Sequence, residues 1–492
     1  MASEITSQQV EDNVLRSQID RSLRHPVMFF FTSGAAWLAV SLILGVIASA
    51  KSHSPGFLGE CSFFNYGRVF QAHMATFIYG WGAQAAFGVI IWLMARLSRQ
   101  ESKKSGIILA IGHFWNFAIS LGTLCILMGP GFILGSGTGK AWMYFPDWVW
   151  PVLLVCYFGI GIWSVIAFRV RRGGHVYISQ WYLMAALFWF PWVFLTGNIF
   201  INTFADAGNG VMAAGINAWF RSAMLFLFFT PVAIASAYYI TPKVTGRPVY
   251  SYKLALLGFW SLAVIGPWAG MQKVMGAPIP SFLQFAGAGA AVLFIIPALC
   301  VAVNILKTAT GKTSAVAHSP SLRFTMAGII GLIATAVVGG LLALPGALRY
   351  TQFAFGGTYG YEILALYGFF SMSMFGAIYF IVPRVTNREW ISVGLIRQHF
   401  WLSLYGVVFI GLFCCILGAF MHGYALETFT VPAESAQDRL YAYTVGVTTG
   451  WVFVAVANVF FCLHLLLMWL RLGRRSSHPT LLQHHTPTIP VA

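Results

Sequence analysis

The chain has 492 residues, of which 58% are hydrophobic and only 9% are charged. Soluble domains carry roughly 45–50% apolar and about 25% charged residues, so this composition excludes a soluble globular protein and a disordered chain. The formal net charge of +16 does not indicate a nucleic-acid binder, because no basic stretch is interleaved with stacking aromatic residues. The expected partner is therefore a lipid bilayer, and no nucleic acid is expected.

Twelve apolar runs are long enough to cross the roughly 30 Å hydrocarbon core of a bilayer. They cover residues 27–50, 69–95, 106–130, 149–168, 181–201, 218–240, 254–271, 282–306, 324–345, 358–382, 400–422 and 445–470. We predict an all-α, polytopic membrane protein with one membrane domain over residues 27–470. The polar segment 1–26 is expected to lie along the membrane surface, and residues 471–492 are expected to form a disordered tail.

The distribution of basic residues predicts the orientation of these helices. Of the 29 Lys and Arg residues, 22 lie in the N-terminal segment, in every second loop and in the C-terminal tail. The other seven lie on or near the opposite side: Lys51, Arg68, Lys140, Arg221, Lys273, Arg349 and Arg439. Because basic residues concentrate in cytoplasmic loops, we predict twelve helices with both termini, 1–26 and 471–492, in the cytoplasm.

Soluble-enzyme motifs are absent from the sequence. The seven cysteines form no CxxC or CxxCH pattern, which argues against a zinc ribbon and against covalently attached c-type heme. Most of them fall in apolar runs, where we expect small buried hydrophobic residues. The sequence also lacks an HExxH motif, a carboxylate pair within a span and a glycine-rich phosphate loop, so a hydrolase or a kinase has no support.

Ionisable residues inside a membrane are costly and are therefore functional candidates. The sequence places six of them in or at the ends of the apolar runs: His73, His113, Arg221, Glu362, His422 and His464. A lone histidine in an apolar helix is more often a hydrogen-bonded core residue than a metal ligand. The sequence around each histidine is therefore needed to distinguish a metal ligand from a core residue.

The sequence around His73, NYGRVFQAHMATFIYGWGAQAAFG, resembles helix two of the catalytic subunit of cbb3-type cytochrome c oxidases, which belong to the heme–copper oxidase superfamily. The resemblance continues through GGHVYISQWYLMA (173–185), YYITPKVTGRPVYSYKLALLGFWSLAVIGPWAG (238–270), FGAIYFIVPRVTNRE (375–389) and QHFWLSLYGVVFIG (398–411). It implies the twelve-helix bundle of oxidase subunit I in a bacterial inner membrane. It further implies c-type cytochrome partners and the reduction of oxygen.

The resemblance also implies where the metal ligands of the family would stand, and most of them are missing. Counted from the matched motifs, the three copper histidines correspond to Ser222, Gln272 and Lys273, and the two heme histidines of helix ten correspond to Tyr361 and Ile363. Gly266 stands in place of the tyrosine that the family joins to a copper histidine. Residues 217–317 and 319–398 contain no histidine that could replace these ligands. We expect Ser222, Gln272 and Lys273 to converge in one small region among helices two, six, seven and ten.

His73 is the one family ligand that this chain keeps, since the family uses it on the low-spin heme. We therefore predict no catalytic residue, no metal ligand and no copper, and at most one b-type heme on His73. Two alternatives stay open for this heme: His73 is a hydrogen-bonded core residue without heme, or His422 replaces the missing second ligand. Separately, Tyr361 could in principle ligate a heme at its own matched position, since some heme proteins use tyrosine.

The predicted function is that of a divergent subunit I-like membrane subunit of a respiratory electron-transfer complex. It has lost the oxygen-reducing centre and acts as a structural, partner-binding subunit for c-type cytochrome subunits or for another oxidase subunit. One alternative is a genuine terminal oxidase whose ligands have moved to His113, His422 and His464. Another is a channel through the emptied cofactor cavity, with Glu362 and Lys273 on its wall.

Overall fold

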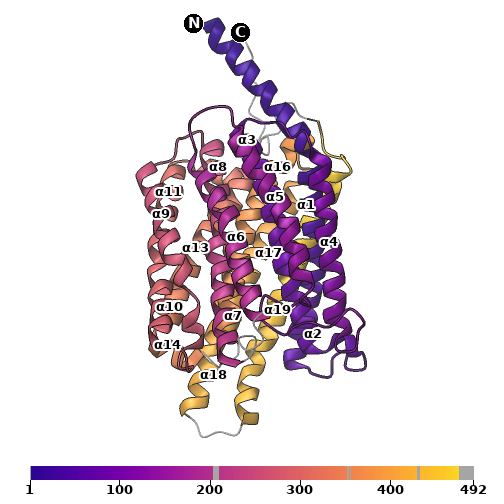
Figure 1. The fold of residues 1–492 in the computed structure, drawn as a ribbon, viewed down its shortest axis with the longest axis vertical. Helices are drawn as coiled ribbons and strands as arrows, with labels where there is room; N and C mark the ends of the chain where they lie inside the picture. Colours follow the sequence, from indigo (N-terminus) through magenta and orange to yellow (C-terminus); the bar gives the residue numbers. More distant parts are fainter. Residues whose placement is uncertain (1, 203–209, 352–353, 355, 429–432, 476–492) are drawn as a thin grey trace.

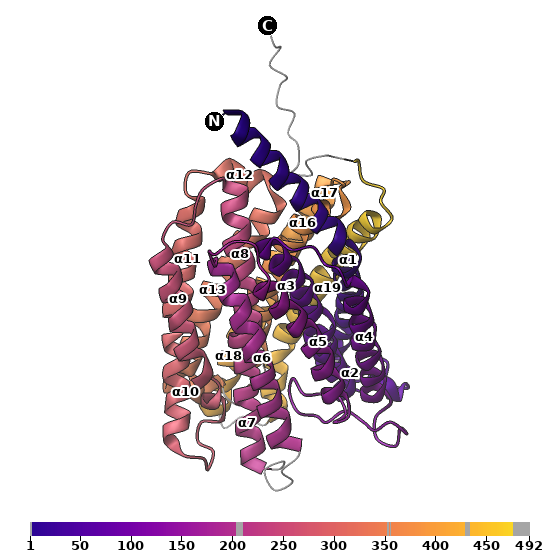
Figure 2. The ribbon, with the colours of Figure 1, turned by 45° about the horizontal axis from the view of Figure 1, so that its top comes forward.

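Long helices run side by side in an upright bundle in the computed structural model, which describes residues 2–202, 210–351, 354, 356–428 and 433–475 (Figure 1). The N-terminal part of the first helix extends beyond one end of this bundle, as a second view confirms (Figure 2). We call this the terminus end and the opposite one the far end.

The twelve spans follow the chain order and are numbered one to twelve. Their elements are α1 (Ala2–His53); α2 (Tyr66–Ala75), η2 (Thr76–Gly82) and α3 (Ala83–Ser98); α4 (Ser105–Met128); α5 (Val149–Arg169); α6 (Ile178–Asn202); α7 (Gly210–Met224), η3 (Leu225–Phe229) and α8 (Thr230–Thr245); α9 (Tyr252–Ile265), η4 (Gly266–Trp268) and η5 (Met271–Val274); α10 (Ser281–Leu293) and α11 (Ile295–Ala309); α13 (Pro320–Ala343); α15 (Gly357–Ile363), η6 (Leu364–Ser371) and α16 (Met372–Thr386); α17 (Val393–Val408), η7 (Phe409–Ile416) and α18 (Leu417–Thr428); and α19 (Ala433–Trp469). Three short helices lie between spans: η1 (Ser62–Phe64), α12 (Thr313–His318) and α14 (Pro345–Thr351).

The predicted all-α class and the predicted number of spans are confirmed. Among the described residues, twelve helices are long and apolar enough to cross a membrane, and each overlaps one of the predicted runs. The described ranges contain no strand, only an isolated antiparallel bridge between Arg388 and Arg475. All seven cysteines are free and five of them are buried, which agrees with their expected role as small hydrophobic residues.

Spans two, six and ten form the centre of the bundle. In their most apolar stretches, 100%, 94% and 100% of the residues are buried, against 39–56% in the other nine described spans. Close backbone approach supports this packing: a Cβ on Gly331 of α13 would lie only 2.2 Å from the carbonyl oxygen of Gly368 in η6. Small residues let membrane helices approach in this way.

Each of the three central spans contains a π-helical segment: η2, η3 and η6. In η6 the Ser371 hydroxyl donates to the Leu366 carbonyl five residues earlier, at 2.7 Å, and accepts from Trp81 Nε1 at 2.8 Å. π-Helical turns are rare and frequently lie at functional sites. Three of the four spans that the resemblance assigns to the cofactors, two, six and ten, therefore contain such a turn, and span eleven has another in η7.

The N-terminal segment differs from the expected separate element. α1 continues as one helix through the predicted boundary at residue 26. The physical reason is that the later residues of segment 1–26 already pack on the bundle. The buried Asp20 carboxylate accepts a hydrogen bond from Trp92 Nε1 at 2.9 Å and pairs with Arg96 Nη1 at 3.3 Å. This contact joins α1 to α3 before the apolar run begins.

We predict that the terminus end faces the cytoplasm, because most basic residues lie there. In a Cys61→Ser background, Asp147→Cys should react with a membrane-impermeant maleimide in intact cells, since Asp147 is exposed at the far end. Lys103→Cys, one span away, should react only after the cells are lysed. Labelling of Lys103→Cys in intact cells would show that the orientation is reversed.

Candidate functional site

The residues at the matched ligand positions lie on three segments toward the far end of the bundle. Ser222 lies on α7, Gln272 and Lys273 lie on η5, and Tyr361 and Ile363 lie on α15. α7 packs directly against η5, and the Lys273 ammonium lies 5.7 Å from the centre of the Tyr361 ring. The structure therefore brings Lys273 beside Tyr361 and packs the helix that carries Ser222 against η5, while the convergence of the Ser222 side chain with Gln272 and Lys273 stays a prediction.

A glycine lets span seven reach this region, although most of that span is peripheral. Gly270 adopts φ +126°, and a Cβ there would lie 2.6 Å from the Ala218 carbonyl oxygen on α7. A residue with a side chain fits neither this backbone conformation nor this distance. The resulting turn is tied by the Gly270 amide, which donates to Gln272 Oε1 at 2.7 Å. The turn thereby places Gln272 and Lys273 beside α7.

An ion cluster occupies the site instead of metal ligands. Glu362, which lies between Tyr361 and Ile363 in sequence, pairs through Oε1 with Arg221 Nη1 at 2.9 Å and with Lys273 Nζ at 3.7 Å. Its second oxygen, Oε2, accepts a hydrogen bond from Trp142 Nε1 at 3.0 Å. The side chains of Arg221, Lys273 and Glu362 are only 17%, 13% and 6% exposed. We refer to Arg221, Lys273 and Glu362 as the ion cluster.

The loop between α4 and α5 covers the ion cluster at the far end. Trp142 holds a left-handed backbone with φ 64°, which is uncommon for a residue with a side chain and marks local strain. Its carbonyl accepts from the Tyr79 hydroxyl at 2.7 Å, and Asn217 Nδ2 on α7 donates to Ala141 at 2.7 Å. Burial, together with the nearby Glu362 carboxylate, raises the pKa of Tyr144 in this loop. The loop thus keeps Trp142 directed at the Glu362 carboxylate.

These residues do not fit the copper and high-spin heme of the family. Copper takes imidazole and thiolate ligands, whereas the three copper positions supply the Ser222 hydroxyl, the Gln272 amide and the Lys273 ammonium group. The two heme positions supply the phenol of Tyr361, whose ring instead lies 5.7 Å from the Lys273 ammonium, and the aliphatic side chain of Ile363. Two cations beside the carboxylate would also repel a metal ion. Within the described part of the chain, no three His, Cys, Asp or Glu residues are grouped closely enough to hold a metal.

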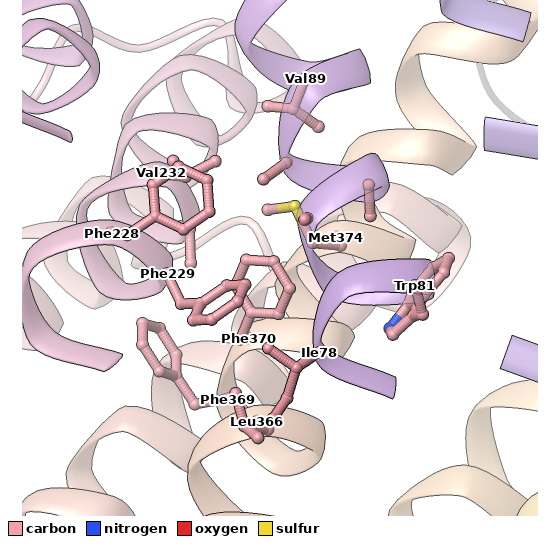
Figure 3. Close-up of a cluster of buried hydrophobic side chains, with 14 of the residues drawn as sticks. Ile78, Trp81, Val89, Phe228, Phe229, Val232, Leu366, Phe369, Phe370 and Met374 are labelled. Atoms are coloured by element: carbon pink, nitrogen blue, oxygen red, sulfur yellow. The ribbon is translucent and has the colours of Figure 1, made fainter. Parts of the chain in front are cut away.

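Aromatic side chains fill the space between the central spans next to the ion cluster. Figure 3 shows Phe229 of span six beside Phe370 of span ten, while the Phe228 ring points the other way, and its closest ring contact is with Phe190 of α6 at 4.7 Å. The Phe229 ring lies 4.8 Å from the Phe370 ring and 5.1 Å from the Phe228 ring, and each of these rings is fully buried. We call these three residues the phenylalanine cluster. They give the centre of the bundle a packed hydrophobic interior.

His73 is buried against span one at the far end. Its Nδ1 donates to the Ser41 carbonyl at 2.7 Å, and its Nε2 lies 3.4 Å from the Tyr359 hydroxyl. The ring also packs edge-on against Trp451 at 5.1 Å. A neighbouring cavity of about 140 Å³ is smaller than the roughly 300–1,000 Å³ of common ligand pockets. The Nδ1 hydrogen bond is typical of a ligating histidine, but both ring nitrogens have polar neighbours in the protein.

The other predicted histidines do not join this site. His113 is exposed on α4 and packs against Phe29. His464 lies at the terminus end, where its Nε2 accepts from the amides of Ile391 and Ser392, both at 3.1 Å. His422 is half-buried on α18, which packs on α14 and η7.

Sequence reasoning missed one buried histidine, His399 on α17. Its Nδ1 pairs with the Tyr379 hydroxyl at 2.9 Å, and its ring stacks on Phe461 at 5.0 Å. His399 lies one residue before the predicted apolar run 400–422 and was therefore not counted among the residues within the membrane. The signal that could have revealed it is the apolar sequence that follows it, QHFWLSLYGVVFIG.

Comparison with known proteins agrees with the fold. Residues 25–476 match the family described as Cytochrome C and Quinol oxidase polypeptide I. A cytochrome c oxidase subunit 1 homolog from Azorhizobium caulinodans is 24% identical, with 76% of this chain and 68% of the relative covered. The cbb3-type cytochrome c oxidase subunit CcoN1 of Stutzerimonas stutzeri is 25% identical over 76% of this chain and 78% of the relative. For cytochrome c oxidase subunit 1 of Rhodobacter capsulatus the values are 24%, 76% and 70%.

The family match extends from the second half of α1 to the end of the described residues, and it contains all twelve spans and the ion cluster. The chain therefore belongs to the cytochrome c and quinol oxidase polypeptide I family, with a cytochrome c oxidase subunit I-like membrane bundle.

Proposed function

We propose that this subunit I-like protein has lost the oxygen-reducing heme–copper centre and serves a respiratory electron-transfer complex as a non-catalytic, partner-binding subunit. The observation that carries the proposal is the ion cluster. Lys273 stands at a matched ligand position, and it and Arg221, the neighbour of Ser222 in sequence, both pair with Glu362. Oxygen reduction in this family needs imidazole ligands for copper and for heme iron at the matched positions.

Packing next to the ion cluster supports the same proposal. A heme between the central spans would need the space that Phe228, Phe229 and Phe370 occupy. Protein interiors are close-packed, so a macrocycle cannot enter without displacing such side chains. The phenylalanine cluster stabilises the bundle by hydrophobic contact.

His73 remains the one candidate heme ligand. Its Nδ1–H bond to Ser41 directs the Nε2 lone pair toward the Tyr359 hydroxyl at 3.4 Å, which a heme iron would have to displace, and a neutral imidazole is a suitable axial ligand for heme iron. Ile363, which replaces the opposing ligand, cannot bind iron. We propose that the protein carries no copper and at most one b-type heme, held on His73 alone.

The proposed partners are c-type cytochrome subunits or a second, intact oxidase subunit in a bacterial inner membrane. The resemblance to a cbb3-type subunit supports this assignment. The exposed aromatic and aliphatic side chains along the outer spans suit contact with lipid or with apolar helices of other subunits.

Neither alternative function gains support from the contacts at the site. Relocated oxidase ligands would have to include His113, which is exposed, or His464, which caps the start of span eleven through Ile391 and Ser392. A channel would need a continuous row of polar groups along its path. Next to the ion cluster, however, the centre of the bundle is filled by the phenylalanine cluster.

We predict that the purified protein, expressed with heme and copper supplied, contains no copper and no more than one heme per chain. It should not consume oxygen with reduced cytochrome c. Any reduced-heme absorption should disappear in His73→Ala, with His113→Ala as the matched control. Metal analysis, the reduced-heme spectrum and oxygen uptake provide the three measurements. Two hemes with copper, together with oxygen uptake, would refute the proposed function.

We predict that Glu362→Ala destabilises the protein by about 3–5 kcal/mol, because it leaves two mostly buried cations without a carboxylate. Denaturant unfolding in detergent micelles measures the change. The matched control is Glu427→Ala, since Glu427 pairs with Arg349 on the surface and exposed pairs contribute about 0–1 kcal/mol. Equal losses in both variants would mean that the ion cluster does not stabilise the bundle.

A further inference from the structure

The ion cluster carries one positive charge more than its carboxylate can neutralise. Arg221 and Lys273 both contact the same oxygen, Glu362 Oε1, and the longer of the two contacts, 3.7 Å, belongs to Lys273. Charges taken out of water are normally paired, because an unpaired buried charge is costly. Lys273 is therefore the member of the cluster that is weakly neutralised.

A cavity of about 50 Å³ lies beside Lys273, among α10, α13 and α15. Roughly 10–15 Å³ of cavity volume accommodates one water molecule, so this space suits a small ion and excludes a macrocycle. Polar donors on its wall include Lys273, the Gln272 amide and the Tyr361 hydroxyl, and Phe226 and Phe294 form its apolar side. The cavity thus combines a cation with neutral hydrogen-bond donors.

A second observation, independent of the charge, also indicates a ligand. Thr335 lines the same cavity and is only 2% exposed, yet its hydroxyl has no hydrogen-bond partner within the protein. A buried hydroxyl without a partner destabilises a protein, and such groups are rare. Gln272 is already oriented by the Gly270 amide on its Oε1, which leaves its NH₂ group as a donor.

We propose that this cavity binds a small monovalent anion, such as chloride, nitrate or formate, between Lys273 and Thr335. The bound anion would neutralise the excess positive charge and accept a hydrogen bond from the unpartnered Thr335 hydroxyl. Hydrogen bonds between an anion and charged or neutral donors are stronger in a poorly solvated site than in water. The inference rests on the proposed function, because a copper ion at the matched positions would occupy the same region.

The first test measures thermal unfolding of the purified protein in sodium gluconate, whose anion is too large for the cavity. Chloride then replaces gluconate at constant ionic strength. A specific site should raise the unfolding temperature with saturation, by about 3 °C at concentrations far above the dissociation constant. Nitrate and formate should act in the same way. An unfolding temperature that is the same in all four salts would overturn the inference.

Two variants connect this response to the site. Thr335→Val removes an unpartnered hydroxyl, so we expect unchanged or higher stability in gluconate but about tenfold weaker chloride binding. Lys273→Met should remove the chloride response. Thr325→Val is the matched control on the same helix, because the Thr325 hydroxyl already donates to Ser321 at 2.8 Å, and it should respond like the parent protein. A full chloride response in Thr335→Val and Lys273→Met would show that the anion binds elsewhere.

The copper content of the same sample separates this inference from the proposed function. A copper-free protein that responds to chloride supports both. A copper-free protein without a chloride response contradicts the anion site alone. Copper bound in stoichiometric amount contradicts the proposed function, and the anion site fails with it.

Discussion

The arrangement at the far end of the bundle depends on one carboxylate, that of Glu362. Through its two oxygens it contacts Arg221 on α7, Lys273 on η5 and Trp142 in the loop between α4 and α5. Three segments far apart in sequence are thereby held against span ten. In a medium that solvates charges poorly, losing this carboxylate would leave Arg221 and Lys273 repelling each other. The carboxylate pairs with both cations, and these positive charges make the region unfavourable for a metal ion.

The interior next to this carboxylate is organised by packing rather than by polar contacts. Spans two, six and ten each contain a π-helical turn, and in their most apolar stretches nearly all side chains are buried. Phe228, Phe229 and Phe370 meet at the centre. Large apolar side chains thus fill the middle of the bundle. A protein can keep the architecture of an enzyme family while its site chemistry changes.

The sequence was sufficient to predict the fold, because helices in a bilayer must satisfy their backbone hydrogen bonds internally and so appear as long apolar runs. The alternation of basic loops supported the count of twelve, and the structure has twelve such helices in its described ranges. The continuous α1 was missed because the contact of Asp20 with Trp92 and Arg96 is tertiary.

The site was predictable in part. The matched motifs predicted that Ser222, Gln272 and Lys273 would lie near one another, and the structure packs α7 against η5. Arg221 and Glu362 were recognised only as separate ionisable residues. Their pairing, and the approach of Lys273, depend on the turn at Gly270 and on helix rotation, neither of which a hydrophobic pattern encodes. The Trp142 hydrogen bond likewise comes from an irregular loop with a left-handed residue.

The central claim is that protein side chains occupy the place of the oxygen-reducing centre. An experimental density map of the protein, purified from membranes supplied with heme and copper, tests it most directly. The account predicts Glu362 in contact with Arg221 and Lys273, and Phe228, Phe229 and Phe370 packed without a macrocycle between them. Density for a heme between spans six and ten, or for a metal ion beside Gln272 and Lys273, would contradict it.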